Sequence, residues 1–140
     1  MIINIYGSTG EIGKKTLNLI NSRFPNIRVN LLCAGSNENL LIKQIKIYKP
    51  KYVYLNKNFN LSKLGKKNFS KTSKILSYDK LCDYLNKSKS DLSILAISGY
   101  KSLYFLENII KNTKNLGLVS KEAIVSAGHL FKKKKIFPKN

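Results

Sequence analysis

Several features are scarce in this sequence. No stretch approaches the roughly 18 apolar residues of a membrane-spanning helix, so we expect no span. Its cysteines, Cys33 and Cys82, fit no metal-ligand spacing and indicate reduced thiols. The single histidine, His129, has no Cys, Asp or Glu at ligand spacing, which favours a surface or capping role over catalysis. The N-terminus enters a strand-like run without a signal-peptide pattern, so we expect a cytoplasmic location.

Acidic residues and arginines are also few. Against 26 basic residues stand 7 acidic ones, which gives a formal net charge of +19. Such a balance is typical of proteins that bind nucleic acid or anionic membranes. However, only Arg23 and Arg28 are arginines, and phosphate and base recognition favours the guanidinium group. The lysines are scattered among Asn and Ile, as an AT-rich coding sequence would produce. We therefore do not expect nucleic acid as a partner, although a basic nucleic-acid-binding protein stays an alternative.

Strand-like and helix-like segments alternate along the 140 residues, of which 43% are hydrophobic. The strand-like runs are 2–6, 29–34, 52–55, 75–76, 91–99 and 116–119. Helical spacing begins near residues 12, 41, 77, 102 and 120, with Ser77 or Asp79 and then Ser102 as expected N-caps. The pattern predicts an α/β fold, a doubly wound Rossmann-like parallel sheet in a single domain. We assign residues 1–131 to this domain, 132–140 to a basic C-terminal tail and 56–73 to a polar insertion.

The segment "YGSTGEIG", residues 6–13, follows the first strand-like run. Gly10 and Gly13 match the last two glycines of G-x-G-x-x-G, while Ser8 holds the first position and Gly7 precedes it. In a strand–loop–helix unit, such glycines permit a tight turn, close approach of a pyrophosphate and close helix packing. The flanking strand and helix favour a dinucleotide site over an ordinary glycine-rich turn. Glu11 would repel a pyrophosphate, so we expect its side chain to face solvent and its backbone N–H to serve the ligand.

The end of the second strand-like run bears on the choice of cofactor. NAD sites usually carry an acidic residue there, about 20 residues after the glycine loop, for the ribose hydroxyls. Here "AGSN", residues 34–37, contains no acid, and Glu38 is the first. Neutral donors, backbone N–H groups and Lys43 would suit a 2′-phosphate, which favours NADPH. The same segment also fits a simple cap at the start of the next helix, and both roles are compatible.

Four motifs occur in order: "STGEIG", "AGSN", "LAISG" and "SKEAIVSAGHLF". Together they resemble the N-terminal NADPH-binding domain of 1-deoxy-D-xylulose 5-phosphate reductoisomerase. The resemblance implies an NADPH-dependent oxidoreductase of non-mevalonate isoprenoid biosynthesis that also uses a divalent metal, Mg or Mn. Its reaction is the isomerisation and reduction of a sugar-phosphate substrate to 2-C-methyl-D-erythritol 4-phosphate.

The resemblance also assigns site residues. The NADPH-binding loop would comprise Ser8, Thr9, Gly10, Glu11 and Ile12, and the adenosine 2′-phosphate end would lie at Gly35, Ser36 and Asn37. Lys121 would contact the substrate phosphate, and Ser120 and Glu122 would lie on the nicotinamide side of the cofactor. Ser120 stands where the family has Asn, which removes an amide donor. Apart from the resemblance, the Lys121–Glu122 pair fits the exposed first turn of a helix.

The family's "DSE" metal-binding motif is expected about where this chain ends, in "IFPKN". We therefore expect no metal ligands and no complete catalytic set in this chain, and no activity from it alone. A fragment, a decayed gene product or part of a split enzyme would each fit, with a possible homodimer or a complementing chain carrying the catalytic domain. The alternative within the fold is another Rossmann NADP-dependent dehydrogenase, such as the semialdehyde type. That type needs a catalytic cysteine, for which neither Cys33 nor Cys82 is well placed.

Overall fold

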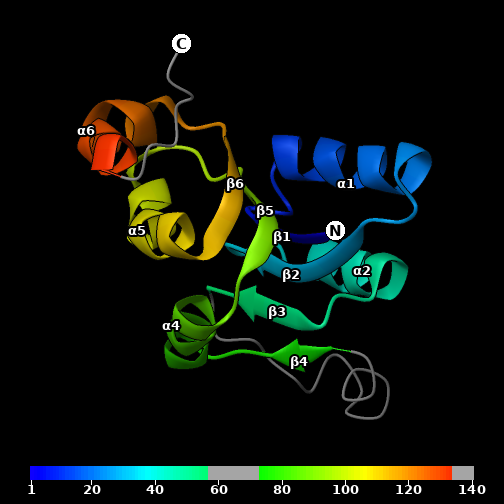
Figure 1. Cartoon of the computed structure of the whole chain (residues 1–140). Helices are drawn as coiled ribbons and strands as arrows, with labels where there is room; N and C mark the ends of the chain where they lie inside the picture. The colour runs from blue at the N-terminus through cyan, green and yellow to red at the C-terminus, as the bar shows by residue number, and fades with distance from the viewer. Residues whose placement is uncertain (57–72, 134–140) are drawn as a thin grey trace.

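One parallel sheet of six strands organises the computed structural model, which describes residues 1–56 and 73–133 (Figure 1). The strands are β1 (Ile2–Tyr6), β2 (Arg28–Ala34), β3 (Tyr52–Leu55), β4 (Lys74–Ile75), β5 (Ser90–Leu95) and β6 (Thr113–Leu118). The helices are α1 (Glu11–Arg23), α2 (Glu38–Tyr48), α4 (Tyr78–Lys87), the 3-10 turn η2 (Tyr100–Ser102), α5 (Leu103–Asn112) and α6 (Lys121–Lys133). Strands and helices alternate through most of this order, as the sequence predicts.

The strand order β4-β3-β2-β1-β5-β6 reverses direction at β1. The chain first builds outward from β1 to β4 and then returns to place β5 on the other side of β1, with every pairing parallel. The carboxyl ends of β1, β2 and β5 therefore meet at a topological switch point, where open α/β sheets bind their ligands. This topology confirms the predicted doubly wound, Rossmann-like sheet.

Helices cover both faces of the sheet because both faces of its central strands are apolar. On one face, Ile3 and Ile5 of β1 lie in a buried cluster with Leu17 of α1 and Leu41 of α2. On the other face, Tyr6 lies in a second cluster to which α4, α5 and α6 contribute. In Figure 1 these three helices lie together on the side of the sheet away from α1 and α2. The two buried layers hold the strand ends, and with them the site, in fixed positions.

Two expectations about the segment after the fifth strand are wrong. We predicted a strand over 91–99, but β5 ends at Leu95, and the chain then leaves the sheet as a loop in which Gly99 has a positive φ of 73°. Ser102 does not cap α5, because it already has helical backbone angles and makes no side-chain cap bond. Its hydroxyl instead lies 2.7 Å from the carbonyl oxygen of Gly99, to which it can donate. By contrast Ser77, one of the two caps expected for α4, accepts from the N–H of Lys80.

The proposed boundary at residue 131 falls inside α6, which continues to Lys133. Most of the insertion expected at 56–73, and the tail from residue 134, lie outside the described residues. The division into a domain and a tail thus stays a prediction.

Candidate functional site: a cleft at the carboxyl edge of the sheet

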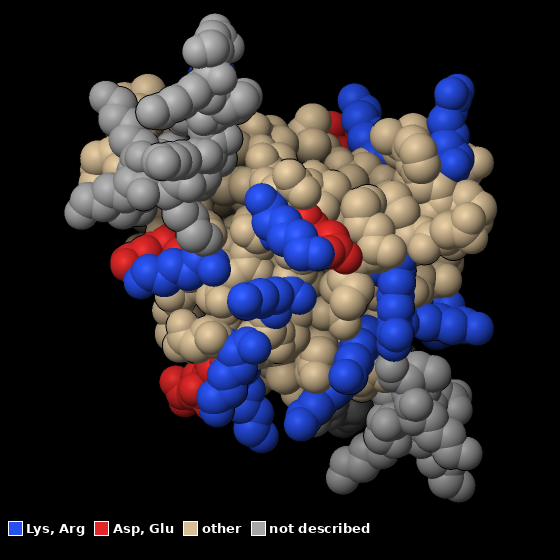
Figure 2. Space-filling view, in the orientation of Figure 1, with Lys and Arg blue, Asp and Glu red and all other residues tan. Residues whose placement is uncertain are grey.

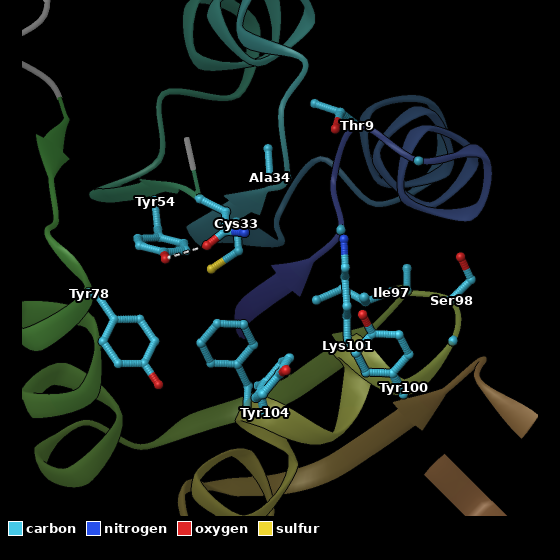
Figure 3. Close-up of a pocket in the computed structure, with 17 residues that line it drawn as sticks. Thr9, Cys33, Ala34, Tyr54, Tyr78, Ile97, Ser98, Tyr100, Lys101 and Tyr104 are labelled. Atoms are coloured by element: carbon cyan, nitrogen blue, oxygen red, sulfur yellow. Dashed lines mark hydrogen bonds between the residues drawn. The ribbon is translucent and has the colours of Figure 1, made fainter. Parts of the chain in front are cut away.

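A cleft of about 790 Å³ opens at the switch point, a size typical of small-molecule sites. Its lining comes from the loops that follow β1, β2, β3 and β5, and from the starts of α4 and α5 (Figure 3). The lining residues are Gly7, Thr9, Gly10, Cys33, Ala34, Gly35, Tyr54, Asn56, Tyr78, Ala96, Ile97, Ser98, Gly99, Tyr100, Lys101, Tyr104 and Phe105. The glycine loop and the "AGSN" segment, far apart in sequence, therefore border the same cavity.

Glycine is required at two positions of the loop for different reasons. Gly7 has a φ of 86°, and a Cβ there would lie 2.6 Å from the carbonyl oxygen of Ala96. A Cβ on Gly13 would overlap the carbonyl oxygen of Gly7 and lie 2.7 Å from the Cα of Ser8. Gly7 thus makes the tight turn and Gly13 lets α1 approach the loop closely, two of the three tasks that the sequence pattern implies.

The start of α1 faces the cleft without a side-chain cap. Gly10 occupies the N-cap position, where no side chain accepts from the first-turn N–H groups. Thr9 and Gly10 line the cleft. Open N–H groups at a helix N-terminus, together with its positive dipole end, bind phosphate readily. This part of the cleft can therefore hold an anionic group.

Ser8 and Ile12, also predicted for the site, do not line the cleft. Ser8 is fully buried, and its carbonyl oxygen accepts from Gln44 Nε2 at 2.7 Å. Its hydroxyl has no hydrogen-bond partner among the described residues. The Ile12 side chain is partly exposed on α1. Ser8 thus supports the loop through its backbone N–H and carbonyl groups, and the cofactor contacts of Ser8 and Ile12 stay predictions.

Glu11 faces solvent, as expected. Its carboxylate lies 3.0 Å from Lys14 Nζ and 3.4 Å from Lys15 Nζ on the exposed surface of α1. Hydrogen bonds from these two lysines lower the pKa of Glu11. The paired charge is directed away from the cleft, since Glu11 is absent from its lining. Repulsion of a bound phosphate by this carboxylate is thereby reduced.

At the end of β2, Gly35 lines the cleft with nothing within 4 Å of a built Cβ. Asn37 caps α2, because its Oδ1 accepts from the N–H of Leu40 at 3.1 Å. The carbonyl oxygen of Ser36 accepts from the N–H of Glu38. The capping role left open by the sequence is therefore present. Lys43, on the exposed side of α2, does not line the cleft.

Ser120 and Glu122 form a hydrogen-bonded group at the start of α6. The buried Ser120 hydroxyl can donate to Glu122 Oε2 at 2.8 Å and accept from the N–H of Ala123 at 3.3 Å. Bonds from its own backbone N–H, then from the Ser120 hydroxyl, and more weakly from the Gly99 backbone, lower the pKa of Glu122. Neither residue lines the cleft, nor does the exposed Lys121, but the contact with Gly99 joins them to its wall.

Sequence reasoning missed the far wall of the cleft. Lys101, in η2, points its side chain into the cavity in Figure 3, where Tyr100 and Tyr104 also lie. Lys101 forms no ion pair with any residue in the described ranges. The only available signal was the "GYKS" that follows the predicted strand, which no motif marks. These residues bring one cation and several aromatic rings to face the glycine loop.

Metal binding and cysteine chemistry have less support than phosphate binding in the described residues. Residues 1–56 and 73–133 contain no group of three or more His, Cys, Asp or Glu side chains that could hold a metal ion. Burial raises the pKa of Cys33, which favours an unreactive thiol.

No helix in residues 1–56 and 73–133 is both long and apolar enough to cross a membrane. Figure 2 shows lysines and arginines spread over one face, several beside carboxylates, and not gathered into one basic patch.

The sheet order, the glycine loop and the cleft define a Rossmann-like domain of the dinucleotide-binding class. Residues 3–128 match the family described as 1-deoxy-D-xylulose 5-phosphate reductoisomerase. The chain therefore belongs to this family, which confirms the resemblance and overrides the semialdehyde dehydrogenase alternative.

Two curated relatives and two solved structures carry the same name. The chain is 38% identical over 135 residues to the reductoisomerase of Wigglesworthia glossinidia brevipalpis and 36% identical over 136 residues to that of Pelagibacter ubique. Each comparison covers 94% of this chain but 34% of the relative, so the chain spans about a third of their length. The Zymomonas mobilis enzyme in complex with NADPH superposes with a TM-score of 0.78 at 26% identity, over 95% of this chain and 35% of that one. A reductoisomerase structure with fosmidomycin and magnesium gives 0.79 at 27% identity, over 96% and 34%.

Proposed function

We propose that this chain binds NADPH in the cleft and forms the cofactor-binding part of a 1-deoxy-D-xylulose 5-phosphate reductoisomerase. The observation that carries the proposal is the start of α1, which has no side-chain cap and borders the cleft of about 790 Å³. The carboxyl end of β2, which borders the same cleft, carries no carboxylate. The family membership and the relative solved with NADPH support it. The activity that we propose for an enzyme assembled with this domain is the rearrangement and reduction of the sugar phosphate to 2-C-methyl-D-erythritol 4-phosphate.

The described residues fit this cofactor in three places. The first-turn N–H groups of α1, next to Thr9 and Gly10, would hold the diphosphate. Gly35, in the lining of the cleft, and the adjacent Ser36 would face the 2′-phosphate, with Lys101 as a cation that reaches into the cavity, although neither Ser36 nor Asn37 lines it in this structure. Ser120 and Glu122 would lie toward the nicotinamide, which supplies a hydride when bound. The Ser102 hydroxyl lies within hydrogen-bond distance of both the Ser120 hydroxyl and the carbonyl oxygen of Gly99, so we assign Ser120 and Glu122 a positioning role at this loop.

Two further points concern the substrate and the metal. Lys121 is exposed at the first turn of α6, and we propose that it contacts the phosphate of the substrate. The divalent metal seen in a relative is not matched by a ligand cluster in residues 1–56 and 73–133, so we derive no step through it. A cytoplasmic location, a homodimer and a complementing catalytic chain also stay predictions.

Calorimetric titration with NADPH and with NADH tests the proposal. We expect saturable, weak binding of NADPH and weaker binding of NADH, because a carboxylate is missing at the β2 end. The variant Ser36→Asp should reverse the preference by placing a carboxylate beside the ribose, while Ser36→Ala controls for loss of the hydroxyl. No saturable NADPH binding at millimolar protein, or equal binding of NADH by the unaltered chain, would contradict the proposal.

A further inference from the structure

One side of the cleft is built from aromatic rings, which we call the aromatic wall: Tyr54, Tyr78, Tyr104 and Phe105. Tyr54 ends β3, Tyr78 begins α4, and the other two lie in the first turn of α5. The ring centroids of Tyr54, Tyr78 and Phe105 lie 6.2 to 6.4 Å apart in edge-on and tilted arrangements. Figure 3 shows the rings of Tyr54, Tyr78 and Tyr104 gathered along one side of the cavity. Tyr54, Tyr78 and Phe105, from three separate elements, thus form one cluster of rings. The ring of Tyr104 also borders the cavity and lies beside that of Tyr100, with 6.4 Å between the centroids.

The members of the wall differ in burial. Tyr54 and Phe105 are 6% and 9% exposed and belong to the core, where they support the others. Tyr78 and Tyr104 are 50% and 66% exposed, although they border a cavity. A large ring left uncovered beside a cavity has apolar area that a planar ligand could bury. The two exposed tyrosines are therefore the members that a ligand would touch.

The position of the aromatic wall in the sheet indicates which group of a bound dinucleotide would lie next to it. Tyr54 pairs in register with Cys33 of β2, next to Ala34 and Gly35, where the 2′-phosphate is proposed to lie. Ser120 and Glu122, proposed for the nicotinamide side, come after β6, at the opposite edge of the sheet from β3 and β4. The group closest to the wall is therefore the base attached to the 2′-phosphorylated ribose.

We propose that the aromatic wall binds the adenine ring of NADPH by stacking, with Tyr78 and Tyr104 as its contact residues. This inference rests on the proposed function and deepens it, because it assigns recognition of the base to residues outside the four sequence motifs. An aromatic face that stacks a base typically changes affinity by about 1–3 kcal/mol on substitution by alanine, which corresponds to about 5- to 150-fold.

The test compares three single variants by calorimetric titration with NADPH. Tyr78→Ala removes the ring, and Tyr78→Phe retains it without the hydroxyl. Phe24→Ala removes a ring of matched exposure, 49%, that lies outside the cleft lining. We expect roughly a tenfold loss of affinity for Tyr78→Ala and less than about twofold change for the other two. Circular dichroism confirms that each variant is folded, and Tyr104→Ala provides a second measurement if Tyr78→Ala is not.

Fragments of the cofactor separate this inference from the proposed function. The probe 2′-phospho-ADP-ribose keeps the adenine, and reduced nicotinamide mononucleotide lacks it. Tyr78→Ala should weaken binding of the first about tenfold and leave the second unchanged. If the unaltered chain binds NADPH but Tyr78→Ala and Tyr104→Ala bind it equally well, the stacking role is wrong while the proposed function stands. If the unaltered chain binds no NADPH, both are overturned.

Discussion

Replacing Gly13 by alanine tests whether close packing of α1 on the glycine loop holds the site. The added Cβ would overlap the carbonyl oxygen of Gly7 and lie 2.7 and 2.8 Å from Ser8 backbone atoms. Because all three neighbours are backbone atoms, no rotamer change relieves the overlap, and α1 or the loop must move. The loop is tied to β2, since the N–H groups of Gly7 and Ser8 both donate to the carbonyl oxygen of Cys33.

Two opposing contributions set the size of the effect. Overpacking of a well-packed site costs about 1–3 kcal/mol. Alanine in place of a helical glycine stabilises by up to about 1 kcal/mol. We therefore expect Gly13→Ala to lower the free energy of unfolding by about 1–2 kcal/mol. The displaced loop should also weaken NADPH binding, because the first-turn N–H groups of α1 would no longer face the cleft correctly.

Urea denaturation followed by circular dichroism measures the loss. Gly35→Ala is the matched control, because its Cβ would meet nothing within 4 Å. Its free energy of unfolding should change by less than about 0.5 kcal/mol. A Gly13→Ala protein as stable as the unaltered chain, or more stable, would show that helix propensity outweighs the overlap and would refute the reasoning.

Two further predictions concern the far side of the site. Ser120→Ala should lower the free energy of unfolding by about 1 kcal/mol, because the cap on α6 is lost. The same variant should raise the pKa of Glu122, because the hydrogen bond from the Ser120 hydroxyl is lost, and NMR titration of the carboxyl group would record the change. Because the pKa of Glu122 is lowered in the folded chain, its stabilisation is present above the unfolded value, near pH 4.3, and is lost as pH falls through the lower folded pKa. An unchanged carboxyl titration in Ser120→Ala would contradict the pKa prediction, and an unchanged free energy of unfolding would contradict the capping role. Lys101→Ala should weaken NADPH binding about fivefold and reduce its dependence on salt, whereas Lys46→Ala, an exposed lysine outside the cleft, should do neither.

The glycine loop could be predicted because its information is local. Residues 2–6 form a β-branched run that ends at a glycine, and helical spacing begins six residues later, so strand, turn and helix follow from neighbours in the sequence. The tasks expected for a turn glycine and a packing glycine are found at Gly7 and Gly13. The parallel, doubly wound sheet also follows from the alternation of strands and helices, given that parallel crossovers are right-handed. The order β4-β3-β2-β1-β5-β6 does not follow from it, because the same alternation fits other doubly wound strand orders.

The side of the cleft that faces the glycine loop could not be predicted, because its residues come together only in the folded chain. Tyr78, Lys101 and Tyr104 lie on three elements, and each looks in sequence like an ordinary surface residue at a helix start. Ser102 shows a related difficulty: its position fits an N-cap, but a nearby carbonyl oxygen of the loop attracts its hydroxyl instead. The hydrogen-bond partner that a side chain takes depends on tertiary geometry, and the spacing of residues in the sequence does not reveal that geometry.

If the cleft binds NADPH as proposed, its two sides would recognise different parts of the cofactor. The start of α1 offers backbone N–H groups, which in our proposal would contact the phosphates that NADPH shares with many other nucleotides. Such contacts supply affinity without identifying the base or the ribose substituent. Recognition of the base and of the ribose substituent must come from side chains, and we propose the neutral end of β2 and the aromatic wall for these two tasks. Because the net charge of +19 attracts any polyanion at low salt, discrimination between nucleotides is informative only at ionic strengths where that attraction is screened.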